Sequence, residues 1–260
     1  MRRPSPARLL AFAAPALLIA ALLGGWEAAC RALAVPPTSC RRRRRSERRS
    51  RPTQGALLAS AWITLSTALA ALAIAAAVAW PLAFAASLSP TAERALQPLA
   101  VTLQVTPVVA IAPLAVIWAG LDHPGRAIVG LAALVAFFPL FSGALTGLKS
   151  ADPDLERLFD LYQAGRLQRL ARLRLPAAVP YLLEGLKVAS GLAVIGAVVA
   201  EFVAGSGGSQ GLAWRILEAG NRQRTPQMFA ALLALSLLGA ALYAAARALE
   251  AAALRRWRGR

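Results

Sequence analysis

Residues Ser150–Pro180, SADPDLERLFDLYQAGRLQRLARLRLPAAVP, are the longest polar interruption between apolar runs that still has the pattern of ordered helix. Carboxylates occupy its first half and arginines its second. In the second half arginines and leucines each recur every three residues: Arg166, Arg169 and Arg172, then Leu167, Leu170 and Leu173. That spacing predicts an amphipathic helix with arginines and leucines on different faces. We expect a short helix, a bend at 163–165, and a second helix that ends at Leu175-Pro176, because proline lacks the amide hydrogen.

The sequence around this segment has the composition of a membrane protein. Of its 260 residues 58% are hydrophobic, against roughly 45–50% in soluble domains. The excess lies in runs long enough to cross a bilayer, for which about 20 apolar residues suffice. We therefore expect an all-α polytopic membrane protein with about six transmembrane helices. The predicted spans cover residues 9–29, 55–87, 96–120, 127–148, 181–204 and 228–254.

The first 54 residues divide into two predicted parts. Residues 1–33 have a basic start and an apolar run, which favours a retained first span over a cleaved signal peptide. Residues 34–54 are an arginine-rich loop, predicted to be solvated, and our hypothesis is that residues 38–53 are divergent or frameshifted sequence. The net charge of +17 favours anionic lipid over nucleic acid as a partner, because no nucleic-acid motif is present. Cys30 and Cys40 have no metal-ligand spacing, and a disulfide between them is a weak alternative.

The distribution of basic residues predicts the orientation of the spans. With both termini in the cytoplasm, 14 Lys and Arg lie on the inner connections. The outer connections hold 5, apart from the eight arginines of the 41–51 block. Positive charge is enriched on cytoplasmic loops, so we expect a core at 55–254 whose 150–176 loop faces the cytoplasm. Residues 255–260 are then a basic cytoplasmic tail.

Four stretches from residue 104 onward, in this order, resemble one transporter family. They are QVTPVVAIAPLAVIWAGL (104–121), Phe137-Phe138-Pro139 with Gly143 and Gly147, LPAAVPYLLEGLKVAS (175–190), and VVAEFVAGSGGSQGLAW (198–214). From about residue 55 to 254 the chain is similar to the permease subunit of bacterial ABC importers, in the nitrate, taurine and sulfonate branch of the binding-protein-dependent permeases. The resemblance implies a type I (MetI-like) transmembrane domain in the bacterial inner membrane.

The resemblance also implies how such a chain works. It would form a homodimer with two cytoplasmic ATPase subunits, which bind ATP and Mg²⁺, and with an external solute-binding protein. The substrate would be nitrate, a sulfonate, taurine or a vitamin precursor such as a thiamine pyrimidine. In these permeases a short helix in the loop before "LP" docks on the ATPase and carries a Glu-Ala-Ala…Gly signature. Counted back from Pro176, its positions hold Arg157-Leu158-Phe159 and Gln163. The residues expected to couple to the ATPase are therefore Arg157, Leu158, Phe159, Asp160, Gln163, Ala164, Gly165, Leu167 and Pro176.

The sequence contains no recognisable catalytic motif. It has no glycine-rich phosphate loop followed by Lys-Ser/Thr. Its one histidine, His123, lies in a predicted turn at residues 122–125, and we see no Ser/His/Asp set and no metal cluster. We expect no enzymatic activity, no cofactor and no metal in this subunit. The runner-up function, an ion-coupled secondary transporter, would need a mid-membrane ion site at a repeat interface, and no internal repeat is visible. A membrane scaffold is a third possibility.

Five residues are candidates for the translocation path between two permease copies: Pro107, Pro113, Phe137, Phe138 and Glu201. Glu201 lies toward the outer end of the fifth span. A carboxylate there is either functional or tied to the Gly205–Gly211 turn, and the sequence leaves both open. For Glu184 and Lys187, three residues apart, we favour a local ion pair over a role in gating.

Overall fold

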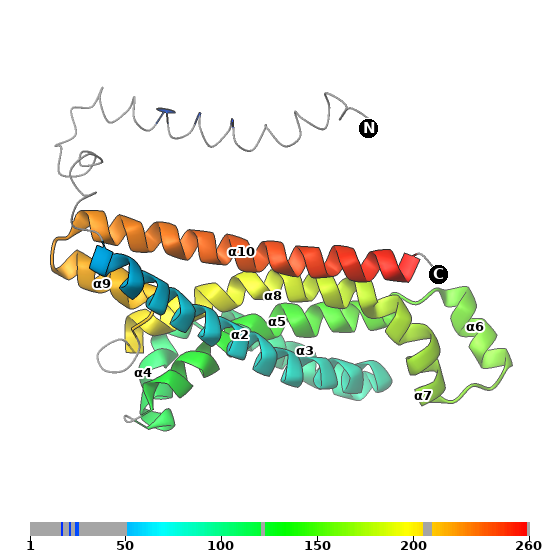
Figure 1. Ribbon diagram of the computed structural model, residues 1–260. Helices are drawn as coiled ribbons and strands as arrows, with labels where there is room; N and C mark the ends of the chain where they lie inside the picture. The colour runs from blue at the N-terminus through cyan, green and yellow to red at the C-terminus, as the bar shows by residue number, and fades with distance from the viewer. Residues whose placement is uncertain are drawn as a thin grey trace, which may run out of the picture. The chain divides into compact units, whose positions relative to one another are not determined.

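The computed structural model describes residues 51–120, 123–204 and 210–258, together with Leu17, Ala21, Gly24 and Gly25. The first predicted span lies outside them apart from those four residues, which are helical. Residues 51–258 form one compact unit, helical throughout its described part and without a strand there (Figure 1). Its helices are α2 (Arg51–Leu88), α3 (Pro90–Val105), α4 (Val108–Ala119), α5 (Pro124–Lys149), α6 (Pro153–Leu161), α7 (Arg166–Arg169), the π-helical turn η1 (Leu170–Arg174), α8 (Leu175–Ala204), α9 (Leu212–Asn221) and α10 (Thr225–Arg258).

The number of apolar helices agrees with the predicted membrane fold. Four helices are each long and apolar enough to span a bilayer, and the bent pair α3–α4 would be a fifth. They correspond to the second through sixth predicted spans. The second, fourth and sixth spans differ from the prediction by a few residues at most, whereas the helical run of the fifth begins at Arg166, 15 residues before the predicted start at residue 181. The connection between the fifth and sixth predicted spans contains the short helix α9.

The centre of the unit is the pair α5 and α8, with α2 packed along α5 (Figure 1). One stripe of alanines on α2 is almost completely buried, at successive spacings of three and four residues: Ala68, Ala71, Ala75, Ala79, Ala83 and Ala86. This period keeps the stripe on one face of the helix. Small side chains on that face allow close helix packing in a membrane, where van der Waals contact rather than the hydrophobic effect drives association.

Helices α5 and α8 approach even more closely, at glycines. A Cβ atom on Gly185 would lie 2.8 Å from the carbonyl oxygen of Pro139, and one on Gly143 would lie 3.2 Å from the Cα atom of Gly185. Two of the stretches that carry the family resemblance, the 137–147 run and 175–190, therefore pack directly on each other.

The third predicted span, residues 96–120, is wrong as a single helix. The chain breaks at Thr106-Pro107, and α3 and α4 meet at a bend of 99°. Both residues are extended, with ψ angles of 125° and 104°. Pro107 cannot supply an amide hydrogen and disfavours helical geometry in the residue before it. The predicted connection after Ser89 is also wrong, because it is the first turn of α3, with the Ser89 hydroxyl as its N-cap.

The predicted helix end at Leu175-Pro176 is likewise wrong. Helical structure continues from Arg166 through η1 into α8. In η1 the chain makes a wider turn, and the amide of Leu175 donates to the carbonyl of Leu170, five residues earlier. The wide turn shifts the hydrogen-bond partners by one residue. Pro176 is the second residue of α8 and follows directly on this π-helical turn, inside continuous helical structure.

Candidate functional site

Helix α6 is held at its start and left uncovered along its length. The side chain of Asp152 accepts a hydrogen bond of 2.8 Å from the amide of Asp154, which caps the helix. No side chain of α6 is buried, and Leu155, Leu158 and Leu161 are 46%, 43% and 81% exposed. These leucines, three residues apart, form a surface on α6 that nothing in the described chain covers.

The bend after α6 lies where the sequence predicts it. Gln163 has a φ of +51°, a left-handed conformation that is uncommon outside glycine. The amide of Ala164 donates to the carbonyl of Phe159 at 2.9 Å, and Gly165 precedes the first residue of α7. The bend reverses the chain, so that α6 and α7 form a hairpin.

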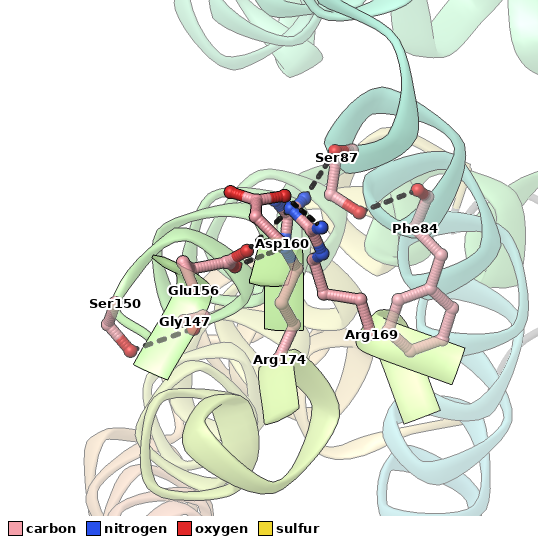
Figure 2. A network of polar contacts seen from close by, with 8 residues as sticks. All are labelled: Phe84, Ser87, Gly147, Ser150, Glu156, Asp160, Arg169 and Arg174. Atoms are coloured by element: carbon pink, nitrogen blue, oxygen red, sulfur yellow. Dashed lines mark hydrogen bonds and ion pairs between the residues drawn. The ribbon is translucent and has the colours of Figure 1, made fainter. Parts of the chain in front are cut away.

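Ion pairs connect the two arms of this hairpin. Arg169 of α7 donates to Glu156 at 3.2 Å and also pairs with Asp160, both on α6 (Figure 2). Arg174 in η1 donates from Nε to the other carboxylate oxygen of Glu156 at 2.7 Å. Glu156 therefore binds two arginines from the second arm. The side chains of all three residues are 21–27% exposed, which shields these pairs partly from solvent.

A third element joins through Arg174. Its Nη1 donates to the backbone carbonyl of Ser87 at 3.1 Å (Figure 2). Ser87 lies in the last turn of α2, where carbonyls have no partner within the helix. The side chain of Arg174 thus links α6, η1 and the end of α2.

The predicted coupling residues occupy different parts of this hairpin. Leu167, 74% exposed, and the leucines of α6 are on its surface, whereas Arg157 is exposed and pairs only locally, with Asp154 at 3.1 Å. Asp160 belongs to the ion-pair network, and Pro176 lies beyond it in α8. Glu156, Arg169, Arg174 and Ser87, which hold the network together, were not among the predicted site residues. Glu156 and Arg174 are 18 residues apart, and no helix spacing rule connects them.

Glu201 lies at a second polar site, where α2, α8 and α9 meet. Its carboxylate accepts from the Thr64 hydroxyl at 2.9 Å and from the amide of Ala213 at 3.1 Å. The Thr64 hydroxyl in turn accepts from the amide of Leu212 at 2.9 Å. Both side chains are fully buried. A Cβ on Gly211 would lie 2.2 Å from the carboxylate oxygens, so only glycine leaves room for them.

The other candidates for the translocation path are scattered over the described unit. Pro107 and Pro113 are exposed, at the α3–α4 break and within α4. Phe137 and Phe138 are half-buried on α5 and pack against the central core, where Phe137 stacks on Phe141 with ring centroids 5.7 Å apart. The single unit does not bring these residues and Glu201 to one surface.

The predicted pair of Glu184 and Lys187 is confirmed, and it extends to a neighbouring helix. Lys187 also donates to Glu250 of α10 at 3.0 Å. Across the described ranges no three His, Cys, Asp or Glu side chains converge in a way that could hold a metal ion.

Comparison with known proteins shows which protein family the chain resembles. Residues 71–258 match the family model described as "Binding-protein-dependent transport system inner membrane component". The chain is 38% identical over 158 residues to formylaminopyrimidine transport permease protein ThiX of Halalkalibacterium halodurans, covering 61% of each chain. It is 31% identical to the putative aliphatic sulfonates transport permease SsuC of Bacillus subtilis, covering 66% of this chain and 60% of the relative.

A longer match is to the taurine transport system permease protein TauC of Escherichia coli, 31% identical over 76% of this chain and 71% of the relative. The matched region spans less than two thirds of the length of ThiX and SsuC. The family model covers both the α5–α8 core and the α6–α7 hairpin, and more than half of the sequence. The chain therefore belongs to the family of inner membrane components of binding-protein-dependent transport systems.

Proposed function

We propose that this chain is the membrane-spanning permease of an ATP-driven importer for a small solute, working as a homodimer in the bacterial inner membrane. Two ATPase subunits would bind its cytoplasmic side, and a solute-binding protein would deliver substrate from outside. Family membership supports the permease role. The α6–α7 hairpin is the observation that supports contact with an ATPase.

That hairpin has the two properties that a force-transmitting contact requires. Its leucine surface is exposed and gives a partner protein apolar area to cover. It is also stiffened from behind, because Arg174 and Arg169 tie α6 to the second arm, and Arg174 ties both to α2. A displacement of α6 by a partner would therefore reach the ends of α2 and α8 together.

The substrate is proposed only as a class. The named relatives transport formylaminopyrimidine, aliphatic sulfonates and taurine, as their names state. These are small polar solutes that a binding protein could select. We propose a sulfonate- or taurine-like anion, nitrate, or a vitamin precursor such as a thiamine pyrimidine, moving between two copies of the chain. ATP and Mg²⁺ would be bound by the partner ATPase, where hydrolysis would occur.

Reconstitution tests this function against the ion-coupled alternative. The full chain, its partner ATPase and its solute-binding protein would be placed in liposomes. Uptake of labelled taurine, an alkanesulfonate, nitrate and formylaminopyrimidine would then be measured. We expect uptake only with internal ATP and all three components, and no effect of an ionophore that collapses ion gradients. Uptake that follows an ion gradient without the ATPase would overturn the proposal in favour of a secondary transporter, and no uptake of any solute would favour a scaffold.

A further inference from the structure

A cavity of about 170 Å³ lies where the second turn of α2 and the first turn of α10 meet α9. Leu57 lines it from α2, Gln227 from α10, and Arg215 and Glu218 from α9. Two more arginines, at 222 and 224, complete it from the connection between α9 and α10. This cavity is separate from the α6–α7 hairpin and from Glu201, and no function discussed above uses it.

The charges around the cavity are unbalanced. Three guanidinium groups face one carboxylate, a net charge of +2. Glu218 is shared by Arg215 at 3.6 Å and Arg222 at 3.1 Å, and Arg224 makes no ion pair with a described residue. Arg222 is 58% exposed even with this pair. The cavity therefore attracts an anion that can accept several guanidinium hydrogen bonds, as phosphate oxygens do.

Part of this lining is held in place before any ligand binds. The Nε of Arg215 donates to the hydroxyl of Ser60 at 3.0 Å, and Ser60 is buried on α2. Arg215 is therefore fixed by α2 on one side and by Glu218 on the other. A fixed guanidinium loses less conformational entropy on binding an anion than a free one.

The depth of the cavity relative to the spans favours a lipid over a soluble anion. The apolar spans begin at Gly55 on α2 and at Thr225 on α10, so the cavity lies at the level where both enter the bilayer, which is the level of the headgroups. Large apolar side chains are exposed within the next two turns: Leu58 and Trp62 on α2, and Phe229 and Leu233 on α10. A headgroup phosphate in the cavity would leave its acyl chains beside such apolar surface.

We infer that this arginine cavity binds the phosphate of an anionic phospholipid at the end of the molecule opposite the α6–α7 hairpin. Free inorganic phosphate shares the recognised group, but it lacks the acyl chains that the neighbouring apolar side chains would contact. In the orientation predicted from the basic residues, the lipid would belong to the outer leaflet. The site would anchor the second turn of α2 and the first turn of α10 to each other through the headgroup.

Lipid titration of the detergent-solubilised full chain tests this inference. Native mass spectrometry would measure the binding of phosphatidylglycerol and of phosphatidylcholine to the wild type and to three variants. We expect preference for phosphatidylglycerol and about a fivefold loss of its affinity in Arg224→Gln, because one basic residue near a membrane surface contributes about that factor. Glu218→Gln should raise the affinity by a similar factor, since it removes the only carboxylate among the described residues that line the cavity. A general folding defect would instead lower the affinity in both.

The control is Arg126→Gln, which removes an exposed arginine from the first turn of α5, outside the cavity, and should leave lipid binding unchanged. Unchanged phosphatidylglycerol binding in Arg224→Gln, or equal binding of both lipids by the wild type, would overturn the inference. So would displacement of phosphatidylglycerol by inorganic phosphate beyond that by chloride at equal ionic strength, which would assign the cavity to a soluble anion. If Arg224→Gln instead weakened only the binding of the solute-binding protein, the cavity would be a protein contact. None of these outcomes depends on ATP-driven uptake.

Discussion

The hydroxyl of Thr64 connects α2, α8 and α9 through hydrogen bonds that an apolar side chain could not make. It donates to Glu201 of α8 and accepts from the amide of Leu212 at the start of α9. The first amides of a helix lack partners within that helix. Glu201 satisfies one such amide of α9 and Thr64 another, in a region from which water is excluded.

Replacing Thr64 with valine should lower stability by about 1–3 kcal/mol, because it leaves the amide of Leu212 unsatisfied and removes a donor from Glu201. In a chain of this size that corresponds to a drop in Tm of about 2–4 °C per kcal/mol. Thermal unfolding in detergent measures it. Thr64→Ser, which keeps the hydroxyl, is the matched control and should retain most of the stability. Equal losses in both variants would show that the methyl group, not the hydroxyl, matters.

Arg174 allows a prediction about coupling rather than stability. Arg174→Gln removes the contacts with Glu156 and with the carbonyl of Ser87, worth about 1 kcal/mol at a partly exposed site. Under the proposed function, less solute should be transported per ATP hydrolysed, because α6 is no longer tied to α2. Uptake and hydrolysis measured on the same proteoliposomes give this ratio. Arg172→Gln changes an exposed neighbour that makes no side-chain hydrogen bond or ion pair with the described residues, and it should leave the ratio unchanged.

The sequence could not have identified these residues as partners. The spacing of the arginines predicts that they share a helix face, but not which of them meets a carboxylate 18 residues away or a carbonyl in another helix. For Glu201 the sequence left two alternatives, and the structure places its carboxylate against Gly211 and Ala213, as the second alternative requires. A role of Glu201 in transport stays a prediction.

Among the helices, the effect of proline on helix continuity was the feature that the sequence predicted least well. The sequence predicts that one span, residues 96–120, continues through Pro107 and that Pro176 ends a helix. In the structure Pro107 separates two helices that meet at 99°, whereas Pro176 lies inside continuous helical structure. The difference depends on what surrounds each proline. A π-helical turn precedes Pro176 and adjusts the hydrogen bonds, while Thr106 before Pro107 is extended.

The long apolar runs were more informative, because the length of helix that crosses a bilayer is set by the helix rise and the bilayer thickness. Runs of about 20 apolar residues locate the second, fourth and sixth predicted spans to within a few residues. The family stretches at 137–147 and 175–190 also contain the glycines at the α5–α8 contact. The sequence shows these glycines, but only the structure shows that they face each other.

Two glycines of α8 provide a matched pair of substitutions. Gly185→Ala would place a methyl group 2.8 Å from the carbonyl oxygen of Pro139 and should destabilise the chain by about 1–3 kcal/mol through overpacking. Gly191→Ala meets nothing within 4 Å and should be neutral or slightly stabilising, because alanine favours helix. Thermal unfolding of both variants checks this. Similar effects in the two would mean that helix propensity, not the α5–α8 contact, determines the result.

The whole unit is asymmetric in how its helices are covered. Of the apolar window of α5, 56% is buried inside the unit, against only 6% for α10. The described residues leave most of α10 uncovered. An exposed apolar surface of this kind suits contact with lipid, which agrees with a membrane-embedded subunit.

The distribution of Lys and Arg along the sequence predicts which end of the unit faces the cytoplasm. The α6–α7 hairpin belongs to the connections that carry most of the Lys and Arg outside the 41–51 block, so it should lie inside, while Gln210, before α9, should lie outside. With Cys30 and Cys40 replaced by serine, Gln210→Cys should react with a membrane-impermeant maleimide in intact spheroplasts. Arg157→Cys should react only after the membrane is opened, although its side chain is 79% exposed. Labelling of Arg157→Cys in intact spheroplasts would place the leucine surface of α6 where no cytoplasmic ATPase could reach it.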